Sequence, residues 1–418
     1  MQNDPLESLL KWAKSFDIEL NECCEIRWST IRGGGRGVFV KQDENLLKSG
    51  EEDDEIAFVS IPERVLLSIK DEKENEKQRQ VPLSDDDRLC FLLLEELAKG
   101  EKSFWSAYLQ TLPEHLDLLE LWQNEEINEL QDTFTIARAE TARNSLERSY
   151  DRVCRTHGKN IVEKKDWFFA KGIVRSRTVS VPWAKSSGAL VPLGDFFNYH
   201  PILLDDNLDE SEEEEKRKPV VGYGIFNEET QRFEFCGRGL KTCKQDSDEI
   251  FMHYGTYTNL ELLELYGFSS GSLNMCDEVF LEVPLLKSSS YVAKIIAHSG
   301  KLCWESLRFL RLEFCIDKKK DKRQHYSGLA ARGEALNTES EMRMCEAVRD
   351  AAATALLSFK TTARDDTDLL LEKKTLMLMR RLRLAVEYRL GVKRALQKTY
   401  KFYDEQKAHL LEEFHRRL

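Results

Sequence analysis

The chain has 418 residues, of which 41% are hydrophobic, and its formal net charge is −12. A chain of this length suits about two or three domains. Its hydrophobic fraction is high enough for a folded core, which argues against wholesale disorder. The acidic balance argues against general binding to nucleic acid or to an anionic membrane, because both require a basic protein face.

The ten cysteines show no CxxC spacing, so we expect free thiols in a reducing compartment and no metal site. No apolar run approaches the roughly 18–20 residues needed to span a bilayer. Leucines at helical spacing predict a short amphipathic helix over Pro5–Ser15, which lacks the apolar core of a secretion signal. These features predict a protein of the cytoplasm or the nucleus.

Residues 1–83 are expected to form this helix and then the first part of a β-rich domain. β-branched and aromatic residues predict strands over Glu25–Ser29, Gly37–Lys41 and Ala57–Ile61. Val65–Ser68 either continues the last strand or begins a helical turn. Lys70–Gln80 has almost nothing to bury, and we expect it to be a charged loop.

Residues 84–170 are expected to form a helical insertion in that domain. Ser84 and the three aspartates after it are typical of a helix start. A leucine stripe then runs at helical spacing toward Gly100. Further helices are predicted over Ser103–Leu112, Leu116–Trp122 and Asn124–Tyr150.

Residues 171–270 are expected to complete the β-rich domain. Gly172–Pro182 is rich in Val, Ile, Ser and Thr and predicts a strand. Tyr223–Asn227 and Arg232–Gly237 predict a β-hairpin. The acidic run Asp205–Lys218 cannot bury apolar surface, so we expect a solvated loop.

Residues 271–418 change to long helical periodicities. Helices are predicted over Tyr291–Phe314, over Ser340–Phe359, and from about Thr367 to Phe414, with Gly391 as the expected point of any interruption. The predicted fold class is therefore α+β: a β-rich domain with a helical insertion, followed by an all-α C-terminal domain.

Three short stretches place polar groups or glycines where a ligand site is expected. Val191–Pro201 carries Asn198 after two phenylalanines, Phe251–Phe268 carries two Tyr-Gly pairs, and Gly33–Gly37 precedes a predicted strand. A buried amide or phenol without a partner costs about 1–3 kcal/mol, and glycine lets the main chain approach a ligand. Together they predict a small-molecule pocket built from distant loops and walled by aromatic rings.

The same residues carry a family resemblance. Gly35-Arg36-Gly37, Leu193–Asn198 and the pairing of Tyr254-Gly255 with Tyr266-Gly267-Phe268 resemble a SET-domain protein methyltransferase. The branch is the one similar to the plant Rubisco large-subunit lysine methyltransferase, as in plant SET-domain-group proteins. The resemblance implies a β-rich SET fold with a helical insertion, and a helical C-terminal domain that helps to hold a protein substrate. It also implies S-adenosylmethionine as the methyl donor.

The resemblance assigns roles to three aromatic residues. Tyr254 is the implied catalytic tyrosine, with its hydroxyl near the transferring methyl group, and it is also implied to contact the cofactor. Tyr266 is implied to line the channel for the substrate lysine. Phe268 is implied to flank the channel or the cofactor, where an aromatic face attracts a sulfonium.

Further residues are implied to bind the cofactor. Asn198 matches the asparagine that contacts its amino-acid end, and the following Tyr199 is expected to contribute main-chain contacts. Arg177 matches an arginine that pairs with the cofactor carboxylate, and Arg175 is the alternative. The backbone contacts to the methionine part are implied to come from Gly35, Arg36 and Gly37.

Two positions depart from the family pattern, and a third fits it. Tyr199 stands where the family has histidine, and His253 stands where the family more often has a small residue. Asp195 fits the family's acidic position, and we interpret it as structural. The main hypothesis is a lysine methyltransferase that acts, as a monomer, on a non-histone protein. Two alternatives stay open: a protein-histidine methyltransferase, and a catalytically silent SET-fold module that binds proteins.

Overall fold

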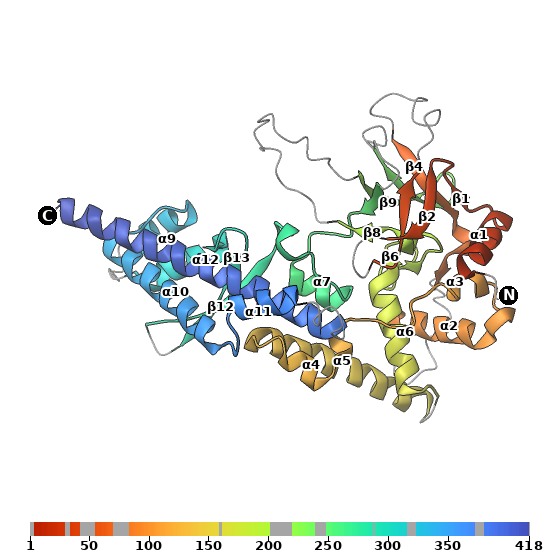
Figure 1. Ribbon diagram of the computed structural model, residues 1–418, viewed down its shortest axis with the longest axis horizontal. Coiled ribbons are helices and arrows are strands. Elements are labelled where there is room, and N and C mark those ends of the chain that lie inside the picture. Colours follow the sequence, from red (N-terminus) through yellow and green to blue (C-terminus); the bar gives the residue numbers. More distant parts are fainter. Residues whose placement is uncertain are drawn as a thin grey trace. The chain divides into compact units, whose positions relative to one another are not determined.

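The structure is a computed structural model that describes residues 4–29, 34–41, 55–69, 83–158, 161–200, 220–238, 248–286, 289–315, 323–372 and 380–417. The chain forms two compact units (Figure 1). The first unit comprises Met1–Leu121, Thr141–Thr256 and Leu265–Gly267, and the second comprises Trp122–Glu140, Tyr257–Glu264 and Phe268–Leu418.

Two sheets form the β part of the first unit. The larger has the strand order β1-β4-β10-β9-β11-β3-β2, with β8 also paired to β11. Its strands are β1 (Glu19–Leu20), β2 (Cys24–Trp28), β3 (Arg36–Val40), β4 (Ile56–Pro62), β8 (Asn198–Tyr199), β9 (Val220–Asn227), β10 (Arg232–Gly237) and β11 (Glu249–Met252). The smaller sheet has the order β5-β7-β6, with β5 (Leu67–Ser68), β6 (Thr178–Val179) and β7 (Ala189–Leu190).

Helices pack beside these sheets around a shared core. The helices are α1 (Pro5–Ser15), α2 (Asp85–Lys99), α3 (Ser106–Leu109) and α6 (Lys164–Arg177), and α5 (Thr133–His157) begins in the second unit and continues into the first. Strand residues such as Val38 and Phe58 share one buried cluster with Leu89 of α2 and Trp167 of α6. Burial of these apolar faces is the main source of stability for the unit.

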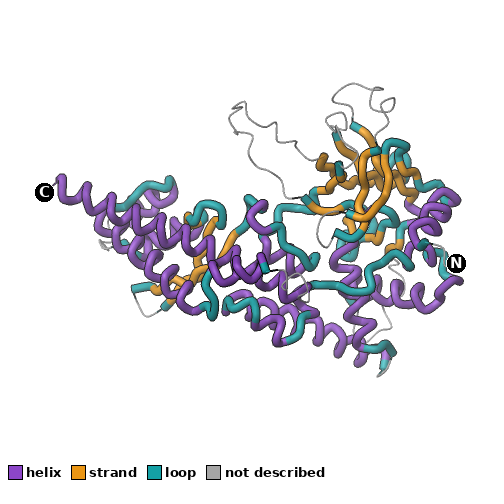
Figure 2. The backbone as a smooth tube through the Cα atoms, in the orientation of Figure 1, coloured by secondary structure: helices purple, strands orange, loops and turns teal. Residues whose placement is uncertain are grey.

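The second unit contains most of the remaining helices and a small antiparallel sheet (Figure 2). The sheet has the order β12-β13-β14, with β12 (Glu278–Pro284), β13 (Ser290–Ile296) and β14 (Lys301–Leu302). The helices are α4 (Asn124–Asn128), α7 (Asn259–Leu265), α8 (Trp304–Glu313), α9 (Arg323–Ala331), α10 (Thr338–Ser358), α11 (Ala363–Leu371) and α12 (Arg380–Arg417). Helices α10 and α12 pack along each other, and α10 also packs on β12.

Several predicted elements are confirmed. The N-terminal helix has the predicted limits, and the three early strands appear as β2, β3 and β4. Ser84 caps α2 by accepting a hydrogen bond from the Asp87 amide at 3.2 Å, and α2 ends at Gly100, whose φ is +56°. The predicted hairpin is the antiparallel pair β9–β10.

The predicted strand over Gly172–Pro182 is wrong in its first half. Helix α6 continues to Arg177, and only Thr178–Val179 is a strand. The buried residues Trp167, Ala170, Ile173 and Val174 recur every three or four positions, so the helical period of burial outweighs the local β propensity of Ile173 and Val174.

The helical insertion also differs in detail. The predicted helix over Asn124–Tyr150 is two helices, α4 and α5, because Gln131 adopts a φ of +58° between them. The predicted helix over Leu116–Trp122 is only a 3-10 turn. Val65–Ser68 fulfils neither alternative: the 3-10 turn Glu63–Val65 ends where this segment begins, and β5 (Leu67–Ser68) belongs to the smaller sheet, so it does not continue β4.

The α+β fold class is confirmed, but the C-terminal region is not helical from its start. The first part of the predicted helix over Tyr291–Phe314 is strand β13, in which buried Ala293 and Ile295 alternate with exposed Val292 and Lys294. This period of two is a strand pattern. The all-helical part is α10–α12, and Gly391 does not interrupt α12.

The predicted loops Lys70–Gln80 and Asp205–Lys218 lie outside the described residues. Within the described ranges no helix has both the length and the apolar character needed to cross a bilayer. The cysteines in these ranges are all free, and these ranges contain no cluster of three or more potential metal ligands.

Candidate active site

Strand β11 brings the predicted site residues together. One edge of β11 pairs with β9, so β3 and β8 share its other edge, one after the other. Ile250 of β11 lies opposite Val38 of β3, and Phe251 lies opposite Asn198 of β8. The consequence is that Asn198 meets the start of β3, where its Nδ2 donates a hydrogen bond to the carbonyl of Arg36, the first residue of the strand, at 3.3 Å.

A buried carboxylate holds this junction. Glu249, the first residue of β11, is 6% exposed. Its Oε1 accepts from Asn198 Nδ2 at 2.5 Å, and its Oε2 accepts from Ser29 Oγ at 2.6 Å. The sequence interpretation missed Glu249, although a charged residue that opens the apolar run Ile250–Met252 is a signal for a partnered carboxylate.

The glycine turn leaves room for these contacts. A Cβ at Gly37 would lie 2.3 Å from Glu249 Oε1, so no larger residue fits there. Gly35 has a φ of +64°, and a Cβ at this position would meet no described atom within 4 Å. The Arg36 side chain turns away from the junction, because it pairs with Asp4 at 3.1 Å and lies over the Trp28 ring. Only the main chain of Arg36 therefore faces the site.

The segment before Asn198 is held by an unusual turn. Leu193 is buried with a φ of +68°, a conformation that costs a non-glycine residue about 1–3 kcal/mol. The next residue, Gly194, has the Phe235 ring where a Cβ would be. Phe197 then stacks on Phe235 with ring centroids 4.9 Å apart. This packing fixes the Phe197 carbonyl beside Asn198.

Tyr254 points its hydroxyl at that carbonyl. The hydroxyl donates a hydrogen bond to Phe197 O, so the phenol lies next to Asn198. Its ring centroid is 5.0 Å from that of Tyr266 and 5.4 Å from that of Tyr199. Burial raises the pKa of Tyr254 far above its usual range, although nearby Arg177 opposes the rise. The phenol is therefore protonated at neutral pH and acts as a donor.

The second Tyr-Gly pair has its own steric reason. Gly267 has a φ of +76°, and a Cβ there would lie 2.7 Å from the main chain of Asp117. Only glycine fits this close approach. The pair therefore places the Tyr266 ring beside Tyr254 through backbone packing against the segment that precedes α4.

Arg177 belongs to a buried cluster near Tyr254. Its Nη1 donates to Asp195 Oδ2 at 2.9 Å, and the Tyr108 hydroxyl reaches the same oxygen at 3.3 Å. Burial raises the pKa of the Asp195 carboxyl, and Arg177 opposes the rise. Arg177 Nε is buried and has no partner among the described residues. The alternative, Arg175, pairs instead with Glu120 at 2.5 Å.

The remaining predicted residues have different surroundings. The ring centroids of His253 and Tyr199 are 6.5 Å apart. Burial lowers the pKa of His253, so its imidazole is neutral at pH 7. His200, which follows Tyr199, is half-buried and places its ring centroid 5.2 Å from that of Phe251. Phe268 belongs to the second unit, and its role beside the cofactor stays a prediction. Tyr108 was not predicted, because nothing in its helical segment marks contact with Asp195.

Sequence comparisons identify one domain and several relatives. Residues 278–396 match the family model described as Rubisco LSMT substrate-binding. Protein SET DOMAIN GROUP 40 of Arabidopsis thaliana is 27% identical over 408 residues, covering 88% of this chain and 80% of that protein. Actin-histidine N-methyltransferase of Homo sapiens is 25% identical over 451 residues, covering 96% of this chain and 68% of that protein.

Solved structures share the fold. The SET domain of LSMT bound to lysine and AdoHcy aligns with a TM-score of 0.68 at 19% identity, covering 97% of this chain and 92% of that one. Rubisco LSMT bound to AdoMet aligns with the same TM-score at 18% identity, covering 98% of this chain and 93% of that one. These alignments confirm the expected SET fold.

Proposed function

We propose that this chain, a SET-domain protein with a Rubisco LSMT substrate-binding domain, transfers a methyl group from S-adenosylmethionine to a lysine of a non-histone protein. The observation that carries the proposal is the position of the Tyr254 hydroxyl on the Phe197 carbonyl, next to Asn198 and beside the rings of Tyr199 and Tyr266. We also propose that the protein works as a monomer in the cytoplasm or the nucleus, in keeping with its composition.

The residues present fit S-adenosylmethionine. The main chain at Gly35 borders open space, which suits close approach of a ligand. Asn198 is fixed by Glu249 and offers an oriented amide. Arg177 retains a buried donor, Nε, without a described partner, which suits a carboxylate. When bound, this cofactor supplies an electrophilic methyl group on a sulfonium.

The chain's own residues would orient the acceptor and favour its neutral form, with the amine proton lost to solvent before transfer. A lysine amine has a reference pKa near 10.4 and must be neutral to attack. A channel lined by Tyr254 and Tyr266 excludes water, and desolvation lowers the pKa of an amine. The Tyr254 hydroxyl, whose pKa burial raises, would serve as a fixed dipole, and its oxygen could accept weak C–H···O contacts from a bound methyl donor. Alignment of acceptor and donor contributes several kcal/mol in such steps.

Two alternatives each have an observation in their favour. Histidine methylation is favoured by the actin-histidine N-methyltransferases, which align over 96% of this chain. Lysine remains our first choice because Tyr266 is present and a phenol-lined channel suits an alkyl amine. A silent binding module is favoured by the departures at Tyr199 and His253.

Calorimetry and labelled transfer separate these possibilities. We expect the full chain to bind S-adenosylmethionine well below millimolar concentration, and to label a protein of a plant tissue extract when the cofactor carries a labelled methyl group. Mass spectrometry of the labelled protein is expected to place the methyl group on lysine. A methyl group on histidine would establish the first alternative, and no binding at millimolar cofactor would establish the second.

Glu249 gives a sharper test of the site. Replacing Glu249 with alanine removes the acceptor that orients Asn198, so we expect Glu249→Ala to weaken S-adenosylmethionine binding about tenfold, equivalent to about 1.4 kcal/mol. Glu249→Gln keeps an acceptor for Asn198 and can donate to Ser29, so it should retain most of the affinity. Calorimetry measures both.

The matched control is Glu234→Ala in β10 of the same sheet, because Glu234 accepts only a long bond from Asn227 at 3.4 Å. Its cofactor affinity should equal that of the wild type. Equal affinities for Glu249→Ala and Glu234→Ala would show that Glu249 does not position Asn198 for the cofactor.

A further inference from the structure

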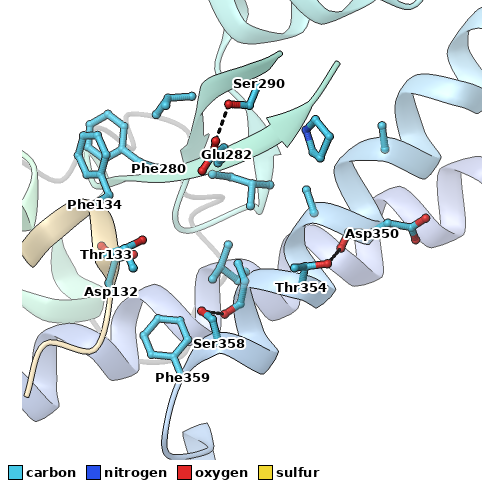
Figure 3. Close-up of a pocket in the computed structure, with 17 residues that line it drawn as sticks. Asp132, Thr133, Phe134, Phe280, Glu282, Ser290, Asp350, Thr354, Ser358 and Phe359 are labelled. Carbon is cyan, nitrogen blue, oxygen red and sulfur yellow. Dashed lines mark hydrogen bonds between the residues drawn. The ribbon is translucent and has the colours of Figure 1, made fainter. Parts of the chain in front are cut away.

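A groove lies in the second unit between helix α10 and the β12–β13 sheet. Its volume is about 660 Å³, within the range of ligand-binding pockets. Residues of β12, β13 and α10 form its sides, and the start of α5 closes one end, where Phe134 stacks on Phe280 with centroids 4.0 Å apart. Figure 3 shows the labelled side chains arranged around this space. We name it the α10 groove.

Small side chains on one face of α10 create the space. Ala347, Ala351 and Ala355 recur every four residues along the groove, together with Thr354 and Ser358. From Ala347 to Ser358 the helix advances about 16 Å at 1.5 Å per residue. Val292, Thr354 and Ser358 are exposed. An elongated, open groove of this kind suits a peptide segment better than an enclosed small molecule.

The charged residues that line the α10 groove are all acidic. Asp132, Glu282 and Asp350 line it, and the described lining residues include no Lys, Arg or His. In Figure 3 these acids lie around the apolar side chains, with Asp132 near Phe134 and Asp350 beside Thr354. Asp350 is partly compensated by Arg349 at 2.7 Å. Asp132 accepts a hydrogen bond from Thr135, and Glu282 accepts one from Ser290, but neither carboxylate forms an ion pair within the described part of the chain.

We propose that the α10 groove binds a segment of the methyl-acceptor protein in which apolar side chains are flanked by lysine or arginine. This inference rests on the proposed function. The apolar floor provides burial for the anchoring side chains, and the acidic rim provides charge complementarity and a faster approach of a basic partner. The groove also lies largely within residues 278–396, which match the substrate-binding family model.

Two substitutions test the groove without touching the candidate active site. Glu282→Lys reverses the charge of an exposed rim residue, and Ala355→Phe fills the space beside α10. The control is Glu305→Lys, an equal charge change at an exposed residue of α8 that does not line the groove. Unchanged thermal unfolding would show that each variant is folded, and Glu282→Lys keeps the test valid if Ala355→Phe does not fold.

The direct probe is a fluorescein-labelled peptide of about 12 residues that combines leucines with lysines, and a second peptide with glutamates in place of the lysines. By fluorescence polarisation we expect wild type to bind the lysine peptide at least fivefold more tightly than the glutamate peptide. Glu282→Lys and Ala355→Phe should each lower the affinity for the lysine peptide at least fivefold, and Glu305→Lys should leave this affinity unchanged. Equal binding by wild type and both groove variants would overturn the proposal.

Labelled transfer distinguishes this inference from the proposed function. If wild type labels an extract protein and both groove variants label it equally well, the inference fails while the methyltransferase stands. If wild type binds the lysine peptide through the groove but labels nothing, the proposed function fails, and with it the assignment of the groove to a methyl acceptor. A wild-type dimer in sedimentation that Ala355→Phe dissociates would assign the groove to a second copy and overturn the proposal.

Discussion

Tyr254→Phe is expected to lower methyl transfer at least about tenfold, equivalent to roughly 1.4 kcal/mol in the activation barrier. The substitution removes the hydroxyl that the Phe197 carbonyl holds beside Asn198 but keeps the ring that packs against Tyr199 and Tyr266. Calorimetry should therefore show nearly unchanged affinity for S-adenosylmethionine, and the loss should appear in the rate of labelled transfer.

Tyr223→Phe is the matched control. Tyr223 lies on β9, the strand next to β11, and it is exposed. Its hydroxyl donates a hydrogen bond to Glu55, so loss of this hydroxyl should leave the rate of methyl transfer unchanged. A wild-type rate in Tyr254→Phe would remove Tyr254 from the proposed role. A loss of cofactor affinity equal to the loss of rate would mean that the hydroxyl acts in binding and not in transfer.

The largest expected effect on stability is at Asp366, which is 0% exposed on α11. Its Oδ1 accepts from Arg389 Nη2 at 2.8 Å, and its Oδ2 accepts from Lys393 Nζ at 2.5 Å. Both cations lie on α12 and are themselves 2% and 1% exposed. Asp366→Asn leaves two buried cations without their shared carboxylate, so we expect a loss of about 3–5 kcal/mol in the free energy of unfolding.

Urea unfolding of the full chain, followed by far-UV circular dichroism, measures this loss. The control is Asp365→Asn. Asp365 is the exposed neighbour of Asp366, and its carboxylate accepts from the Thr362 amide in the capping box that starts α11. Loss of such a cap costs only about 1 kcal/mol. Equal losses in the two variants would show that the buried ion cluster contributes no more than a surface cap.

The pH dependence of the cluster follows from the same contacts. Burial alone would raise the pKa of Asp366, but Arg389 and Lys393 outweigh burial and hold the pKa below its usual range. A carboxyl with a lowered pKa in the folded state stabilises the fold at neutral pH, and this contribution is lost as the pH falls through the lowered pKa. The difference in free energy of unfolding between wild type and Asp366→Asn should therefore become smaller in strong acid.

Local signals in the chain were sufficient for several elements. The capping serine of α2, the leucine stripe behind it and the two strand segments of the β9–β10 hairpin depend on neighbours a few residues away, so they could be recognised in short stretches of sequence. The three ligand-site stretches were recognisable for the same reason. Their glycines and buried polar groups are unusual within their own segments.

Other features depend on contacts between distant residues, which no short window contains. Gly172–Pro182 has the composition of a strand, but packing of its buried face on α2 makes its first half a helix. The basic residues of α12 suggest a solvated face, yet Arg389 and Lys393 are buried because Asp366 on another helix compensates their charge.

The amino-acid sequence by itself predicted the SET-like motifs and the α+β class, because these rest on residue type and local spacing, and the family resemblance carried by those motifs pointed to Tyr254 as the candidate catalytic residue. Only the tertiary structure decided that β3 and β8 share one edge of β11, that Glu249 orients Asn198, and that Arg177 rather than Arg175 joins Asp195. These depend on strand pairing and burial between segments far apart in the chain, which are set by the free energy of the whole fold.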